Sequence, residues 1–140
     1  MQRSLNPGTG AFAVTIRLRT GAGDQNIIQK GQATTSGGMW KIDMVKGHVK
    51  CTFKGSRGRV GVGSRKTVSD SVWHTVRCVR RTTGVSIRVD GGTSRTTAGR
   101  TGRIANSSRL SIGGKASCDP PRVQCDYYIG LLDRVVVQRP

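Results

Sequence analysis

Residues 73–92, WHTVRCVRRTTGVSIRVDGG, contain two runs in which every second residue belongs to one face. The members of these two rows are His74, Val76 and Cys78, then Val85, Ile87 and Val89. The turn-forming residues 82–84 separate the runs, and Asp90-Gly91 forms another turn at the end of the second run. A period of two is typical of strands with one face on a core, so this stretch predicts two adjacent antiparallel strands.

The same alternation recurs along the chain, and no segment shows a convincing helical period. Further strands are expected at residues 12–19, 26–30, 39–45, 48–54, 109–113 and 130–137. Lys46-Gly47 is a hairpin turn signal between two of them. Residues 55–63 are expected to form a loop or a weak strand, and residues 95–103 a loop. Eight or nine short strands with no helix between them predict an all-β sandwich or barrel.

The composition of the chain points to an anionic partner. The 140 residues fit one domain, and 24 Lys and Arg against 7 acids give a formal net charge of +17. This excess favours nucleic acid, anionic glycans, wall phosphates or an acidic protein surface. The alternative is that the charge only keeps the protein soluble. No apolar run approaches the roughly 18 residues of a membrane helix, so no membrane insertion is expected.

Four cysteines in a short, glycine-rich chain favour two disulfides and an oxidising compartment. Cys51 and Cys78 alternate in phase with apolar neighbours, so both are expected to face the core and to pair. Cys118 and Cys125 bracket the proline-stiffened DPPRVQ and form the second expected pair. The sequence permits three pairings. Zinc is the competing explanation, but the spacing contains no C-x2-C pair.

Seven motifs in a fixed order give the chain a recognisable character: NIIQKG (26–31), MWKI (39–42), KCTFKGS (50–56), WHTVRC (73–78), VSIRVDG (85–91), IANSSRLSIGGK (104–115) and YYIGLLDRVVV (127–137). In this order they resemble laminin-G-like domains of secreted bacterial proteins, from about Leu5 to the last strand. The resemblance implies an all-β, two-sheet antiparallel jelly-roll sandwich of the concanavalin-A-like type. Within it, Trp73, residues 85–91 and Leu132-Asp133 look like structural signatures.

The resemblance implies a single domain over residues 1–140 that lacks the usual first strand, because only residues 1–4 precede LNPGTG. Such a strand commonly pairs with the last one. A sheet edge from Val135 to Val137 is therefore expected to be open to a partner strand or an assembly contact. The N-terminus also lacks the apolar stretch of a signal peptide, so either a signal was removed or export takes another route.

Catalysis is not expected. The sequence has no Glu, so the paired carboxylates of a glycosidase are missing, and we find no triad around His48 or His74. His74 is expected to be a packed structural residue. Members of the resembled family sometimes bind calcium, and four aspartates in turns offer ligands: Asp24, Asp90, Asp119 and Asp126. Each is first a turn former, so no cofactor is expected and calcium is left as an alternative.

The function expected from these features is a non-catalytic binding or adhesion module at the cell surface or outside the cell, recognising a glycan, a polyanion or a protein surface. The candidate binding residues are outward-facing cations: Arg17, Arg19, Lys50, Lys54, Arg57, Arg59, Arg65 and Lys66. No sequence-specific nucleic-acid motif is present. The alternative is a structural accessory protein of an assembly, such as a phage virion decoration or a minor capsid or tail protein.

Overall fold

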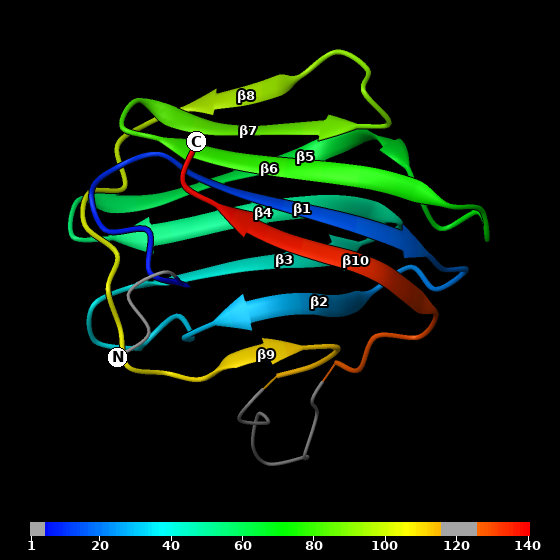
Figure 1. Cartoon of the computed structure of the whole chain (residues 1–140), viewed down its shortest axis with the longest axis horizontal. Helices are drawn as coiled ribbons and strands as arrows, with labels where there is room; N and C mark the ends of the chain where they lie inside the picture. The colour runs from blue at the N-terminus through cyan, green and yellow to red at the C-terminus, as the bar shows by residue number, and fades with distance from the viewer. Residues whose placement is uncertain (1–4, 116–125) are drawn as a thin grey trace.

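The computed structural model describes residues 5–115 and 126–140, which form a sandwich of two antiparallel sheets (Figure 1). The strands are β1 (Phe12–Arg19), β2 (Gln25–Lys30), β3 (Met39–Val45), β4 (His48–Gly55), β5 (Gly58–Thr67), β6 (His74–Arg81), β7 (Gly84–Val89), β8 (Arg95–Ala98), β9 (Leu110–Ile112) and β10 (Leu131–Gln138). One sheet, here the β1 sheet, has the order β10-β1-β6-β7-β8; the other, the β3 sheet, has the order β5-β4-β3-β2-β9. The expected jelly-roll class is confirmed. Within the described residues, no helix is long and apolar enough to cross a bilayer.

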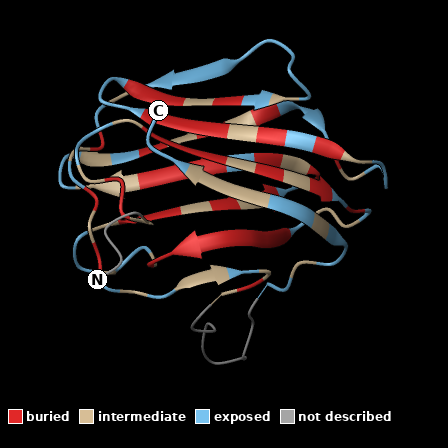
Figure 2. Ribbon diagram, in the orientation of Figure 1, coloured by how far each residue is buried: buried red, intermediate tan, exposed pale blue. Residues whose placement is uncertain are grey.

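The core lies between the two sheets and is built from the alternating rows that the sequence predicts (Figure 2). Three aromatic rings meet within it, toward the end where β1 begins: Phe12 contacts Trp40 with ring centroids 5.3 Å apart, and Phe53 lies 6.3 Å from each of them. All three side chains are fully buried. Because aromatic side chains are few in this chain, this cluster carries much of the large apolar area that Val, Ile and Leu cannot supply alone.

A disulfide crosses this core. Cys51 on β4 and Cys78 on β6 are bonded, with Cα atoms 6.1 Å apart, so the bond joins the β3 sheet to the β1 sheet. This confirms the first predicted pair. The second predicted pair, Cys118–Cys125, lies outside the described residues.

The two predicted glycine-containing turns are confirmed by their backbone geometry: Lys46-Gly47 joins β3 to β4 as a hairpin, and Asp90-Gly91 is a turn at the end of β7. Lys46 and Gly47 have φ angles of 50° and 82°, and Asp90 and Gly91 have φ angles of 51° and 68°. A two-residue hairpin turn of the primed type needs positive φ at both central positions. Glycine meets this requirement without strain, which is why the second position of each turn is Gly.

Two expectations about loops are wrong. Of the two alternatives for residues 55–63, the loop is wrong: from Gly58 onward they belong to β5, which at ten residues is also longer than the weak strand expected. Its outward positions include Gly61 and Gly63, which carry no side chain, so the alternation is hard to see in the sequence. Residues 95–98 form β8, an edge strand whose four residues are all exposed. Such a strand has no apolar row and exists because β7 offers backbone partners.

The last strand, β10, lies at one edge of the β1 sheet. It pairs with β1 on one side, and no other described strand pairs with its second side. Val135 and Val137 point inward, opposite Ile16 and Val14. The start of this strand and the chain leading into it expose large apolar side chains: Leu131, Tyr127 and Ile129.

Candidate anion-binding face

The eight cations predicted as binding residues do not converge on one site. Arg17 and Arg19 point outward from the β1 sheet. The other six lie on β4, β5 and the turn between them, in the β3 sheet: Lys50, Lys54, Arg57, Arg59, Arg65 and Lys66. The outer faces of the two sheets point away from each other, so a ligand that lies on one sheet contacts only one of these groups.

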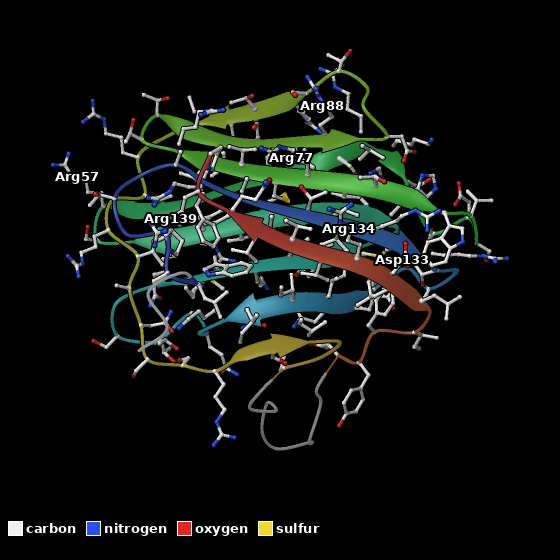
Figure 3. The ribbon with its side chains drawn as sticks, viewed as in Figure 1. Arg57, Arg77, Arg88, Asp133, Arg134 and Arg139 are labelled. Atoms are coloured by element: carbon white, nitrogen blue, oxygen red, sulfur yellow. A yellow bond between two sulfur atoms is a disulfide. The ribbon has the colours of Figure 1, made fainter. Side chains whose placement is uncertain are left out.

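A denser cluster of arginines lies on the outer face of the β1 sheet. Arg17 on β1 is directly opposite Arg134 on β10, and Arg77 on β6 is directly opposite Arg88 on β7. Directly opposite side chains on neighbouring antiparallel strands have Cβ atoms about 4.5–5.5 Å apart. We call these four residues the arginine face; Figure 3 shows Arg77, Arg88 and Arg134 on three of its four strands.

Only one member of the arginine face has a carboxylate partner among the described residues. The Nη1 group of Arg17 donates to Asp133 at 2.9 Å, and its guanidinium lies 4.3 Å from the centre of the Trp73 ring. Arg77 donates to neutral oxygens, Oγ1 of Thr15 and Oε1 of Gln138. Among the described residues, the four arginines of this face are therefore balanced by one carboxylate, that of Asp133.

The remaining two members are free to meet a ligand. Arg88 and Arg134 are exposed, and the Arg88 Nε donates only to the Ser94 hydroxyl at 3.2 Å. Arg17 keeps 41% of its side-chain surface exposed although it is ion-paired. Because guanidinium groups present fixed forks of donors, such a row can contact successive anionic groups of an extended ligand.

Sequence reasoning missed three of these four arginines. Arg77 and Arg88 could have been found, because the turn after Arg81 fixes the register of the β6–β7 hairpin and places the two side chains opposite each other. Arg134 could not, because its position depends on the pairing of β1 with β10, strands from the two ends of the chain.

A second cluster of ionisable groups surrounds His74. The ring is 3% exposed, which agrees with the predicted packed role. Its Nδ1 lies 2.6 Å from Oδ2 of Asp90 and its Nε2 lies 2.8 Å from Oδ1 of Asp70. Asp90 also accepts from the Thr75 backbone N–H through Oδ1. Both ring nitrogens are thus engaged by carboxylates, and neither is left to activate a nucleophile.

The electrostatics of this cluster follow from its geometry. Burial alone would lower the pKa of His74, but the hydrogen bonds and charges of Asp90 and Asp70 outweigh it and raise that pKa. The hydrogen bond from His74 lowers the pKa of Asp70. Burial would raise the pKa of Asp90, yet the bonds from His74 and Thr75 lower it. The cluster is therefore a charged, structural unit at the start of β6.

The aspartates considered as calcium ligands are engaged by the protein itself. Oδ1 of Asp24 accepts from the Lys46 backbone N–H, and Asp126 pairs with Lys115 at 2.7 Å. Asp90 belongs to the His74 cluster, and Asp119 lies outside the described residues. Within residues 5–115 and 126–140, no group of three or more His, Cys or Asp side chains is arranged to hold a metal ion.

Comparisons with known proteins agree with the architecture. The family model described as "Laminin G domain" matches residues 18–139. Domains LG4-5 of the mouse laminin alpha1 chain superpose with a TM-score of 0.75 at 20% identity, over 94% of this chain and 36% of that one. The LG1-3 region of the laminin alpha2 chain gives a TM-score of 0.71 at 18% identity, over 94% and 28%. No curated protein sequence matches significantly. At these identities the structures show a shared fold, and the chain spans about a third of the solved LG4-5 chain that it matches.

Proposed function

We propose a function on the premise that this chain belongs to the laminin G domain family, whose model covers most of its length. Laminin G domains are typically non-catalytic binding modules and are typically extracellular. The proposed role is that of an extracellular, non-catalytic module that binds an anionic glycan through the arginine face. Sulfate or carboxylate groups along the glycan would contact Arg17, Arg77, Arg88 and Arg134.

One observation carries this proposal: like charges are placed directly opposite each other on neighbouring strands, twice on the same face. Opposed like charges destabilise a sheet, so such an arrangement costs stability unless an anion lies between them. A chance surface charge would be scattered or ion-paired, whereas Arg77 and Arg88 have no carboxylate partner among the described residues.

A glycan is favoured over a single-stranded nucleic acid by the side chains between the arginines. Nucleic-acid-binding sheets expose several aromatic rings on which bases stack. The outward positions beside the arginines hold Thr15, Val136 and Thr75 instead, and the ring of Trp73 is covered by Arg17. Hydroxyl groups and a flat surface suit sugar rings that carry anionic substituents.

The test compares dextran sulfate with uncharged dextran by surface plasmon resonance at low and moderate salt. The Arg77→Gln/Arg88→Gln variant is expected to bind dextran sulfate at least tenfold more weakly than the unmodified chain. Its control is Arg65→Gln/Arg109→Gln, which removes the same charge from other surfaces and should stay within about twofold. Equal losses in both variants would mean that net charge alone drives binding. Equal affinity for single-stranded DNA of matched charge would contradict the glycan assignment.

A second candidate function is assembly through the edge of β10. The observation that favours it is the exposure of Tyr127, Ile129 and Leu131 just before and at the start of an edge strand. Exposed apolar groups beside free backbone donors and acceptors suit the addition of a strand from another chain. Light scattering of the purified chain at low and high salt tests this: a salt-insensitive monomer contradicts it, and a defined oligomer supports it.

A further inference from the structure

A separate group of cations lies at the end of the sandwich where β1 begins and β6 ends. Four segments meet there: residues 8–9, 56–57, 80–82 and 100–104. Backbone hydrogen bonds join Gly8 to Ile104, and the N–H groups of Ser56 and Arg57 donate to the carbonyl oxygens of residues 103 and 101. Figure 3 shows Arg57 and Arg139 at this end and Asp133 at the opposite one.

Arg80 is the most unusual residue of this end. It is 1% exposed, the final member of the inward row of β6, and directly opposite the fully buried Phe12. Its Nη1 group donates to Oγ1 of Thr101 at 3.2 Å and to the Gly102 carbonyl oxygen at 2.8 Å; its Nη2 group donates to the Gly8 carbonyl oxygen at 2.9 Å. Its Nε has no hydrogen-bond partner.

The charge of Arg80 is therefore solvated only by neutral oxygens. A guanidinium has five N–H donors, and the three bonds named above leave two without a partner. Burial, and secondarily the nearby charge of Arg139, lower the pKa of Arg80. A buried charge is usually paired with an opposite charge, so this site is electrostatically incomplete.

No side-chain carboxylate is available to complete it. The six described aspartates, Asp24, Asp43, Asp70, Asp90, Asp126 and Asp133, lie in the loops and strand portions toward the other end, where β1 ends and β6 begins. Among the described residues, none forms an ion pair with Arg57, Arg80 or Arg100.

Arg80 lines an open pocket of about 200 Å³ together with Thr9, Arg57, Thr82, Arg100 and Gly102. Arg57 and Arg100 are exposed and come from different segments, so their side chains can close on a ligand from two sides. Thr9 and Thr82 add hydroxyl donors. The pocket is smaller than the roughly 300–1,000 Å³ of typical sites for drug-sized molecules, so it suits a single small group.

We propose that this pocket binds one tetrahedral oxyanion, the sulfate or phosphate ester group of a sugar, between Arg57, Arg100 and the buried Arg80. The oxyanion supplies the counter-charge that the protein does not provide, and its several oxygens match the donors of the guanidinium forks and the two threonine hydroxyls. The site is distinct from the arginine face: it lies at the end of the sandwich and uses an inward residue of β6, whereas Arg77 points outward. The proposal does not rest on that face.

The experiment follows the arginine Nε–H signals of the full chain by NMR during titration with sodium sulfate, against sodium chloride at equal ionic strength. The Arg80 signal is expected to shift and saturate with sulfate alone. Glucosamine 6-sulfate and glucose 6-phosphate are then titrated separately, and their relative affinities identify which ester the pocket prefers. Arg80 itself is kept, because it holds Gly8, Thr101 and Gly102 in place.

The two exposed arginines of the pocket, Arg57 and Arg100, are substituted instead of Arg80. The Arg57→Gln/Arg100→Gln variant is expected to bind sulfate at least tenfold more weakly, while Arg77→Gln/Arg88→Gln, with the same loss of charge, should stay within about twofold. An Arg80 signal that does not saturate with any of the three anions overturns the proposal, as do equal losses in the two variants. Because Arg77→Gln/Arg88→Gln leaves the pocket intact, failure of dextran sulfate binding on the arginine face leaves this result unaffected.

Discussion

Cys51 on β4 and Cys78 on β6 form a fully buried disulfide that fastens one sheet of the sandwich to the other. The two residues are 27 positions apart, so the bond closes a loop of that size in the unfolded chain. It lies in the same core as Phe53, the neighbour of Cys51 in the inward row of β4. The link is therefore part of the core that supports both outer faces.

Removing this link should destabilise the chain. From the size of the loop, Cys51→Ala/Cys78→Ala is expected to lower the free energy of unfolding by about 3–4 kcal/mol, through a less restricted unfolded state. Urea denaturation followed by circular dichroism measures this. The control is Cys118→Ser/Cys125→Ser, which leaves the buried bond in place. A denaturation midpoint unchanged in the alanine variant would contradict the prediction.

Stability should also depend on pH through the His74 cluster. The pKa of His74 is raised above its ordinary value of 6.5 in the folded chain, so its stabilising contribution is complete below that value. The contribution is lost as the pH rises through the folded pKa. The pKa values of Asp70 and Asp90 are lowered from 3.8, so their contributions are present above that value and are lost as the pH falls.

The urea midpoint is thus expected to be highest between pH 3.8 and pH 6.5, the ordinary pKa values of aspartate and histidine. It should fall as the pH rises above about 6.5. His74→Gln should remove most of the fall on the alkaline side. His48→Gln serves as the control, since the His48 Nδ1 contacts the Ser64 carbonyl oxygen rather than a carboxylate. If His74→Gln and the unmodified chain show the same slope, the cluster does not set the pH dependence.

The opposed arginines of the arginine face are expected to lower the free energy of unfolding while they strengthen the binding of an anionic ligand. Arg77 and Arg88 are directly opposite each other, so Arg88→Gln is expected to raise the free energy of unfolding by about 0.2–1 kcal/mol at low salt. Salt screens exposed charges, so the gain should shrink at high ionic strength. The same variant should bind dextran sulfate more weakly. Thermal denaturation at two salt concentrations, compared with Arg109→Gln, measures the effect; a loss of stability in Arg88→Gln would count against it.

Much of the fold could be predicted because the apolar residues alternate. The inward rows of β1, β4, β6 and β7 are visible in the sequence, and their phase was enough to predict that Cys51 and Cys78 meet. Strands without such a row could not be identified: β8 is exposed throughout, and β5 carries glycines at outward positions. Their strand conformation comes from backbone pairing with a neighbour, which a local pattern does not record.

The candidate sites were harder to predict because they depend on long-range contacts. The phase of β6 places Arg80 in the inward row with Val76 and Cys78, so its burial could have been anticipated from the sequence. Its hydrogen-bond acceptors could not, since the Gly8 carbonyl is 72 residues away and the Gly102 carbonyl 22. The pocket exists only once four segments, at residues 9, 57, 80–82 and 100–102, are brought to one end of the sandwich.

Trp73 should report on ligand binding to the arginine face. The Arg17 guanidinium lies over its ring while donating to Asp133, so an anion that binds Arg17 competes with Asp133 and moves the cation relative to the ring. Trp40, the other tryptophan, is fully buried in the core and should not respond. Dextran sulfate is therefore expected to change the tryptophan fluorescence in a saturable way.

Two variants show which tryptophan and which cation produce the change in fluorescence. Trp73→Phe should remove the fluorescence response while leaving affinity, measured by surface plasmon resonance, within about threefold, because a phenyl ring still lies beneath Arg17. Arg17→Gln should weaken both the response and the affinity, since it removes the cation that the anion contacts. A response that persists in Trp73→Phe would place the change at Trp40, and hence in the core. In that case dextran sulfate would perturb the sandwich itself, and movement of Arg17 over Trp73 would not be the source of the fluorescence change.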